Sequence, residues 1–256
     1  MSTATFRFYA ELNVFLPPAQ QQRPIVYSLP ARTAVKHPIE ALGVPHTEVA
    51  LIVASGRAVG FDYIVQANDV VSVYPPFRTL DVSSLTRLRP PWPNPLRFLL
   101  DVHLGRLATY LRLLGFDARY ENEFDDEALA ELAERSRRVL LTRDRRLLMR
   151  KQITYGYCLH SRDPQRQLVA VLRRFDLFEE IDPWQRCLRC NGRLRPVAKE
   201  EVVHRLEPKT KKYYDEFHIC EACGQVYWKG SHYPRMKRFI ERVRQNGAGD
   251  GGAADG

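Results

Sequence analysis

The sequence predicts a mixed α/β protein built from three segments of different character. Strand-like alternation dominates residues 4–77, and short strands and helices alternate through residues 96–178. Two Cys-x-x-Cys pairs lie in the last third of the chain. Strands and helices that alternate with short connections indicate a parallel sheet with helices on both faces. Paired cysteines indicate a segment held together by a metal ion.

Composition sets the broad class of the protein. A chain of 256 residues is long enough for one large domain or two to three small ones. A hydrophobic content of 45% and an aromatic content of 11% are typical of globular proteins. No apolar run approaches the roughly 18–20 residues of a membrane span, and the start MSTATFRF lacks the apolar core of a signal peptide. We therefore expect no membrane partner and a cytoplasmic location.

The first segment predicts a small β-rich domain. ATFRFYAEL and RPIVYSLP alternate as strands, EVALIVASGRAV reads as a hairpin around Ser55-Gly56, and DVVSVYPP reads as a final strand. A short helix is expected over residues 35–42, ending at Gly43. This pattern resembles the β-grasp fold of ubiquitin and the sulfur-carrier proteins. Those carriers are activated at a C-terminal Gly-Gly, whereas this chain continues through Pro75-Pro76-Phe77, so the resemblance implies a module that binds a protein partner.

The middle segment predicts four strand–helix pairs. Asp163 is expected to cap the last helix, and Pro164 to stand in its first turn. The pairs are LRFLLD with VHLGRLATYLRLLG, DARYEN with DDEALAELAERS, RRVLLT with RDRRLLMRK, and YGYCLH with DPQRQLVAVLRRF.

Carboxylates lie at or near the ends of these predicted strands. Because ligands bind beyond the carboxyl ends of the strands in an open parallel sheet, we expect Asp101, Asp126 and Asp144 to converge on one edge. Asp125 and Asp163 are possible additional acids. Clustered carboxylates repel one another unless a cation is present. Oxygen ligands suit Mg²⁺ or Mn²⁺, and such a site polarises a phosphodiester and deprotonates an attacking water.

Each acid has a structural alternative, because Asp is favoured at helix N-caps. For Asp163, followed by Pro164, the cap is the favoured interpretation. Of Asp125 and Asp126, one is expected to cap and the other to be available, and we favour Asp126 as the ligand. A functional role is favoured for Asp101 and Asp144.

Basic side chains surround one of these acids. Arg143, Arg145 and Arg146 flank Asp144 and are expected to bind a phosphate backbone. Arg106, one turn into the first helix, is a further candidate, with a solvated surface position as the alternative.

The cysteines predict a structural zinc site. Cys187 with Cys190 and Cys220 with Cys223 form two knuckles separated by 29 residues. Two such knuckles complete a tetrahedral shell with no open position, so the zinc is expected to stabilise structure and not to catalyse. Redox disulfides are the alternative, which a cytoplasmic setting disfavours. The gap leaves room for a hairpin such as EEVVHRL…DEFHI, and Cys158 is expected to be a small core residue.

The positive charge and the aromatic residues around the cysteines predict that this segment binds a polyanion. The chain carries a net charge of +9, and residues 187–256 hold 14 Lys and Arg against 9 Asp and Glu. Aromatic and basic residues interleave around the knuckles, which suits RNA because bases stack on rings and cations meet phosphates. Some of these rings must instead pack the small core of the segment. The candidate RNA contacts are Lys211, Lys212, Tyr213, Trp228 and Lys229, with Tyr214 and Tyr233 as further rings.

The combination of these motifs resembles one known family. LRFLLDVHLGRLATYLRLLGFDARY, DDEALAELA, RVLLTRDRRLL and a zinc ribbon ending in VYWKGSH occur in this order over residues 96–240. They are similar to the PIN-like RNase family named for the C-terminal domain of the nematode mutator-class exonuclease, the Mut7-C RNase domain. The resemblance implies a PIN-like fold, metal-dependent RNA cleavage and, often, a ubiquitin-like module in front. It places the family's acids on Asp101, Asp126 and Asp144.

These observations define the expected domains and functions. A metal-dependent ribonuclease is the leading hypothesis, since the acid set is complete. The alternatives are a non-catalytic zinc-ribbon protein that binds RNA or the ribosome and carries a β-grasp adaptor, and a regulatory interaction module. The expected parts are a β-grasp domain over 1–78, a Pro-rich linker over 79–95, a PIN-like domain over 96–183, a zinc ribbon with a C-terminal helix over 184–243 and a disordered tail over 244–256.

Overall fold

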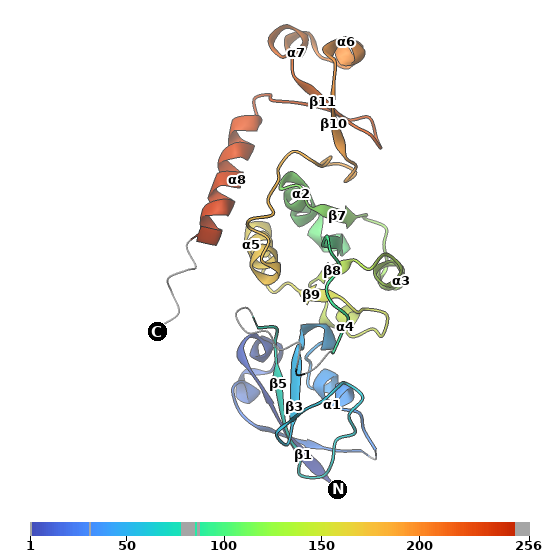
Figure 1. Ribbon diagram of the computed structural model, residues 1–256, viewed down its shortest axis with the longest axis vertical. Coiled ribbons are helices and arrows are strands. Elements are labelled where there is room, and N and C mark those ends of the chain that lie inside the picture. The colour runs from blue at the N-terminus through green and yellow to red at the C-terminus, as the bar shows by residue number, and fades with distance from the viewer. Residues whose placement is uncertain (1, 31, 78–84, 86–87, 249–256) are drawn as a thin grey trace. The chain divides into compact units, whose positions relative to one another are not determined.

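The computed structural model describes residues 2–30, 32–77, 85 and 88–248 and has a mixed α/β fold (Figure 1). Within these residues, no helix has both the length and the apolar character that crossing a membrane requires. The chain divides into two compact units. One unit holds residues 1–94 and 124–158, and the other holds residues 95–123 and 159–256.

A five-stranded sheet with one short helix forms the β-grasp-like N-terminal module. Its strand order is β2-β1-β5-β3-β4, with β1 parallel to β5 and the other pairs antiparallel. Phe6 and Phe8 are buried while Arg7 between them is exposed, so the predicted alternation places one face in the core. The elements are β1 (Thr3–Phe8), η1 (Ala10–Phe15), η2 (Pro18–Gln20), β2 (Ile25–Ser28), α1 (Lys36–Ala41), η3 (His46–Glu48), β3 (Leu51–Ala54), β4 (Arg57–Ala58) and β5 (Val70–Tyr74).

The first strand is shorter than predicted. The pattern of ATFRFYAEL predicts one strand, but β1 ends at Phe8. Ala10 has a φ of 46°, which turns the chain into the 3₁₀ helix η1. Leu12 and Phe15 of that turn are buried, so the apolar residues of this stretch reach the core from a helical turn and not from a strand.

The predicted strand–helix alternation of the middle segment is present in full. The strands pair in parallel within each unit, β6 with β7 and β8 with β9. Their apolar residues, including Phe98, Leu140 and Leu141, are fully buried, as expected for strands covered on both faces. The elements are β6 (Arg97–Leu100), η4 (Val102–Leu104), α2 (Gly105–Leu113), β7 (Asp117–Tyr120), α3 (Asp126–Ser136), β8 (Val139–Thr142), α4 (Arg145–Leu148), β9 (Gly156–Cys158) and α5 (Pro164–Phe175).

Polar contacts explain why the N-terminal module shares a compact unit with β8 and β9. The buried carboxylate of Glu48 accepts a hydrogen bond from the backbone N–H of Cys158 at 2.6 Å. His46 Nε2 donates to the carbonyl of Ile153 at 2.8 Å. The η3 turn therefore supplies partners to backbone groups more than 100 residues away, which ties the module to the edge of β9.

The described end of the Pro-rich linker is packed and not freely extended. Arg89 donates to the carbonyl of Val49 at 3.1 Å, and its guanidinium lies 4.4 Å from the ring centroid of Trp92. Trp92 in turn lies 5.4 Å from the ring of Tyr155. Residues 78–84, 86 and 87 lie outside the described residues.

The C-terminal segment contains a three-stranded antiparallel sheet in the order β10-β11-β12 (Figure 1). The expectation that EEVVHRL forms a strand is wrong, since this stretch forms α6 and η5. Val202 and Leu206, four residues apart, are buried together on Phe217 and Val226, which is helical spacing. The elements are β10 (Leu194–Val197), α6 (Lys199–Val202), η5 (Val203–Arg205), α7 (Pro208–Tyr213), β11 (Phe217–Cys220), β12 (Val226–Trp228) and α8 (Tyr233–Ala248).

The last helix runs past the predicted start of the tail. The composition predicts a tail from residue 244, but α8 continues to Ala248. Phe239, Ile240 and Val243 are buried, and the ring of Phe239 lies 4.8 Å from that of Tyr110 on α2. This packed apolar face supports the helix beyond Val243, the last of these buried residues. Residues 249–256 lie outside the described residues.

Candidate functional site

The four knuckle cysteines come together in one cluster. The sulfur atoms of Cys187, Cys190, Cys220 and Cys223 all lie within 4.8 Å of one another. Cys187 and Cys220 are buried, whereas Cys190 and Cys223 are exposed. Four sulfur donors at this separation fit a tetrahedral zinc ion, as the paired spacing predicts.

Local backbone geometry builds each knuckle. The N–H of Cys190 donates to Cys187 Sγ and the N–H of Cys223 donates to Cys220 Sγ, each at 3.5 Å. The residue after each second cysteine, Asn191 or Gly224, has a φ of 69°, which closes the turn. A Cβ at Gly192 would lie 2.7 Å from Cys220 Sγ, so glycine is required where the two knuckles meet.

A tyrosine that the sequence did not single out contacts the cluster. The Tyr227 hydroxyl lies 3.1 Å from Cys187 Sγ and accepts from the N–H of Leu188 at 3.1 Å. Burial opposes ionisation of Cys187, but the hydrogen bonds from Tyr227 and from backbone N–H groups lower the pKa of its thiol to about 7. Zinc is held by thiolates, so this environment favours the form that the metal requires.

Asp101 is the buried candidate acid, and a helix cap does not explain its position. It directly follows β6 and is 7% exposed. It stands at the N-cap position of η4, yet its side chain makes no capping hydrogen bond. Asp is usually found at this position because it caps, so the burial of this side chain without that role singles it out.

Asp125 and Asp163 cap helices, whereas Asp126 does not. Asp125 Oδ1 accepts from the N–H of Ala128 at 2.8 Å and is the cap of α3, so Asp126 at the first helical position is not. Asp163 Oδ1 accepts from the N–H groups of Gln165 and Arg166 and caps α5.

Asp144 is a cap that uses one of its two carboxylate oxygens. Its Oδ1 accepts from the N–H of Arg146 at 2.7 Å, and its own N–H donates to Thr142 Oγ1 at 2.9 Å. The side chain is exposed and stands two residues after β8. The short loop thus fixes the carboxylate at the end of the strand.

The structure brings together the cysteines, and the convergence of the acids stays a prediction. In the part of the chain that the structure describes, the four cysteines are the His, Cys, Asp or Glu group whose ligand atoms are close enough for one ion. Asp101 belongs to the unit of residues 95–123 and 159–256, whereas Asp126 and Asp144 belong to the other unit.

The arginines flanking Asp144 are exposed, and one of them is engaged elsewhere. Arg143, Arg145 and Arg146 all have exposed side chains, as does Arg106 on α2. Arg145 Nη1 donates to the carbonyl of Phe15 in the N-terminal module at 3.2 Å. Arg143 and Arg146 are therefore exposed arginines that lie within two residues of Asp144 in the sequence.

The predicted RNA contacts around the cysteines differ in exposure. Tyr213 is 65% exposed with Lys212 Nζ 5.4 Å from its ring centroid, and Trp228 is 38% exposed. Lys211 is half-buried, and Lys229 pairs with Glu216 at 2.5 Å. Two of the additional rings are used in packing, since Tyr214 contacts the small core and Tyr233 lies 4.9 Å from Trp184.

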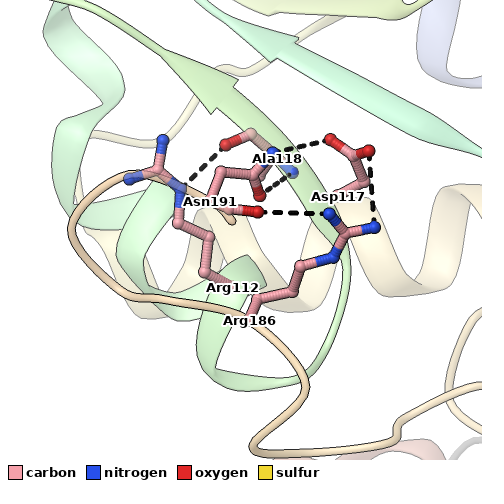
Figure 2. Close-up of polar contacts among 5 residues, drawn as sticks. All are labelled: Arg112, Asp117, Ala118, Arg186 and Asn191. Atoms are coloured by element: carbon pink, nitrogen blue, oxygen red, sulfur yellow. Dashed lines mark hydrogen bonds and ion pairs between the residues drawn. The ribbon is translucent and has the colours of Figure 1, made fainter. Parts of the chain in front are cut away.

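Sequence reasoning missed a polar network under the first knuckle, shown in Figure 2. It joins Arg112, Asp117, Ala118, Arg186 and Asn191. One signal was available: Arg112 lies four residues after the buried Ala108, so an arginine occupies the apolar side of α2. Its partners in the first knuckle are more than 70 residues away and carry no local signal.

Two family models match the chain. The model described as the Mut7-C RNAse domain matches residues 96–240, and the model described as Mut7-C ubiquitin matches residues 1–81. The crystal structure of H. volcanii small archaeal modifier protein 1 is similar at 14% identity and a TM-score of 0.25, covering 30% of this chain and 100% of that chain. No curated protein matches the chain. The match over residues 96–240 spans more than half of the sequence, and it begins at the strand that precedes Asp101 and ends beyond the second knuckle. The chain therefore belongs to the Mut7-C RNAse domain family.

Proposed function

We propose that the protein is a metal-dependent ribonuclease in which Asp101, Asp126 and Asp144 hold Mg²⁺ or Mn²⁺. The observation that carries the proposal is Asp101, a buried carboxylate at a strand end that makes no helix cap. The family match over residues 96–240 supports ribonuclease chemistry as the reaction class. A divalent cation held by carboxylates supplies the Lewis acid that phosphodiester hydrolysis needs.

The other two acids fit the same donor chemistry. Asp126 is exposed, and it does not cap α3 because Asp125 does. Asp144 uses one carboxylate oxygen to accept from the N–H of Arg146, which leaves its second oxygen for a cation. Oxygen donors are those that Mg²⁺ and Mn²⁺ prefer. Asp163 Oδ1 already accepts two backbone N–H groups, so we assign it to the cap of α5 and leave it outside the metal site.

The arginines beside Asp144 supply the binding of substrate phosphates. Arg143 and Arg146 are exposed, and guanidinium groups bind phosphate oxygens in a bidentate manner. Held within two residues of Asp144, they orient the scissile phosphate toward the carboxylate end of β8. The negatively charged Asp144 then binds the metal cation, whereas the positively charged arginines bind the RNA phosphates.

The cysteine segment fits a structural zinc ion and a surface for RNA. Its four sulfur atoms match the donor set of a closed Cys₄ site, which leaves no position for substrate. Lys212, Tyr213 and Trp228 stand exposed on α7 and β12 and would stack on bases and pair with phosphates. The ubiquitin-like module is the part that we assign to a protein partner.

The first test is RNA cleavage by the full-length protein. A labelled total-RNA pool is incubated with Mn²⁺ or Mg²⁺ and the wild-type protein, Asp101→Asn or Asp144→Asn. The Asp144→Asn variant keeps the cap, because Asn caps as well as Asp, but it loses the negative charge. We expect cleavage that needs the added cation and falls at least about a hundredfold in each variant.

A matched acid-to-amide control separates loss of charge from loss of a ligand. Asp176 is exposed at the end of α5 with a φ of 53°, a conformation that Asn adopts well, so Asp176→Asn is expected to cleave like the wild type. RNA that is bound but left intact by the wild type and by all variants would favour the non-catalytic RNA-binding function.

A further inference from the structure

The two knuckles use different residues at the same turn position. Asn191 and Gly224 each follow the second cysteine of a knuckle, and both have a φ of 69°. Glycine at the second knuckle shows that the turn itself needs no side chain. Asparagine at the first knuckle therefore has a further role, and its side chain contacts Asp117 and Ala118 of β7 (Figure 2).

The Asn191 side chain bonds the start of β7. Its Oδ1 accepts from the backbone N–H of Ala118 at 2.9 Å, and its Nδ2 donates to Asp117 Oδ1 at 2.7 Å. Arg186 completes this side of the network, because it donates to the carbonyl of Asn191 at 3.1 Å and pairs with Asp117 Oδ2 at 3.4 Å. Figure 2 shows these groups converging on one residue pair of the strand.

A buried arginine makes the second half of the connection. Arg112 is 4% exposed, and its Nε donates to the carbonyl of Ala118 at 2.8 Å. Its Nη1 donates to the carbonyls of Leu188 and Arg189, at 3.1 and 3.0 Å. Both of these carbonyls lie inside the first knuckle, between Cys187 and Cys190, so one guanidinium bridges the knuckle and the strand.

Together the two side chains satisfy both backbone groups of Ala118. β7 pairs with β6 on one side, and the N–H and the carbonyl of Ala118 are taken by Asn191 and Arg112. An exposed strand edge would leave such groups to water or to another chain. The first knuckle thus covers the edge of β7 through two side chains, without adding a strand to the sheet.

Charge favours this arrangement when zinc is bound. Burial lowers the pKa of Arg112, whereas the nearby sulfurs of Cys187 and Cys190 and the carboxylate of Asp117 raise it. A zinc ion bound by four thiolates has a net negative charge, and a buried cation beside it needs such a partner. The guanidinium and the loaded cluster therefore stabilise each other.

The opposite end of β7 contacts the backbone beside Asp101. The Tyr120 hydroxyl donates to the carbonyl of Val102 at 2.9 Å. A Cβ at Gly105 would lie 2.9 Å from the Tyr120 ring, so glycine allows the ring to pack against the η4 turn. A strand of four residues thus connects the knuckle to the residue that follows the candidate metal ligand.

We propose that Arg112 and Asn191 are positioning residues that clamp the first zinc knuckle to β7, so that a loaded Cys₄ cluster holds in place the strand that supports Asp101. The proposal rests on the proposed function in one respect, the role of Asp101 as a metal ligand. The clamp itself is a statement about zinc retention and backbone order, and both are measurable without RNA and without Mg²⁺ or Mn²⁺.

The test compares zinc-loaded full-length proteins carrying Arg112→Lys or Asn191→Gly. Asn191→Gly keeps the turn, as Gly224 does in the second knuckle, and removes only the side chain. The measurements are the rate of zinc release to a chelator, and amide hydrogen exchange in peptides covering residues 117–120 and 101–105. We expect zinc release to accelerate about tenfold or more, as when contacts that orient metal ligands are lost at other sites, with faster exchange in both peptides.

Two matched controls remain at the wild-type rate. Arg119→Lys changes an arginine of the same strand that pairs with Glu121, and Asn68→Gly removes an asparagine side chain at a φ of 67° in the N-terminal module. Arg112→Lys changes a buried group that also contributes to folding, so Asn191→Gly decides the outcome. Unchanged zinc release in Asn191→Gly, or faster exchange confined to residues 187–192, would overturn the clamp. If the wild type cleaves no RNA, the proposed function fails and the test of the clamp stands.

Discussion

The Cys₄ cluster and the acidic strand ends are two candidate metal centres assembled in different ways. The cysteines come from two tight turns, each of which places two sulfurs by its own N–H···S hydrogen bonds. The acids come from separate elements in the two compact units, and Asp144 also serves as a helix cap. A centre built from local turns is specified over a few residues, whereas a centre built from strand ends depends on the fold around it.

Because of this difference, a metal ion in the cysteine cluster and one at the acidic strand ends would have different roles. A closed thiolate shell contributes to folding, because its four ligands are brought together only in the folded chain. Carboxylates at strand ends would be held by the fold whether or not a cation is bound, so a metal ion at the proposed acidic site would be free to act on a substrate. Changes at the cysteines should therefore affect structure, and changes at the acids should affect cleavage.

The largest expected effect follows loss of one thiolate. In Cys220→Ser, a buried sulfur donor is replaced by a hydroxyl that zinc does not prefer. Since structural zinc sites contribute about 10–16 kcal/mol in small zinc-binding peptides, we expect bound zinc to fall from about one ion per chain to almost none, and β10–β12 to lose protection from hydrogen exchange. Elemental analysis and amide exchange of the full-length protein measure both.

Cys158 is the matched control for that change. It is buried in β9 outside the cluster, and burial raises the pKa of its thiol to about 12, so it is a neutral core residue. Cys158→Ala should retain the zinc content of the wild type. A Cys220→Ser protein with full zinc would contradict the assignment of the cluster.

The second expected effect distinguishes a candidate ligand from its neighbour. Asp126→Asn should reduce metal-dependent RNA cleavage at least about a hundredfold with little change in stability, since it removes the charge of a candidate ligand. Asp125→Ala removes the cap of α3 and should cost about 1 kcal/mol of stability. Cleavage assays and amide exchange in residues 126–136 measure the two effects. Comparable cleavage by Asp126→Asn and the wild type would remove Asp126 from the site.

Local patterns in the sequence predicted much of this molecule, and distant partners account for what they missed. The strands of the middle segment and the cap at Asp163 follow from apolar runs and from Asp-Pro, which act within a few residues. Glu48 and Asn191 carry no such pattern, because each bonds a backbone group more than 70 residues away along the chain. The spacing of Arg112 from Ala108 indicates an arginine on the apolar side of α2, but its partners in the first knuckle are also more than 70 residues away. The helical spacing of Val202 and Leu206 was present in EEVVHRL, and the prediction of a strand there overlooked it.

The smallest expected effect concerns a buried carboxylate that accepts three hydrogen bonds. Asp69, in the N-terminal module, is 7% exposed, as Asp101 is, and it accepts from Ser55 Oγ, the Tyr63 hydroxyl and the N–H of Gln66, at 2.8, 2.9 and 2.8 Å. Burial raises the pKa of this carboxyl, but the three hydrogen bonds outweigh burial and lower it below the ordinary value of 3.8. The ionised form therefore stabilises the fold.

Asp69→Asn should destabilise the module by about 2 kcal/mol at pH 7, because an amide cannot accept all three bonds. A lowered pKa contributes stability above the pKa of the unfolded chain, and that contribution is lost as the pH falls from about 3.8 through the folded value. The difference between the two proteins should thus shrink at pH 3. Protection of the β3 and β5 amides from hydrogen exchange, corrected for the intrinsic rate at each pH, measures it. An effect of equal size at pH 7 and pH 3 would show that lost packing, and not the ionised hydrogen bonds, accounts for the destabilisation.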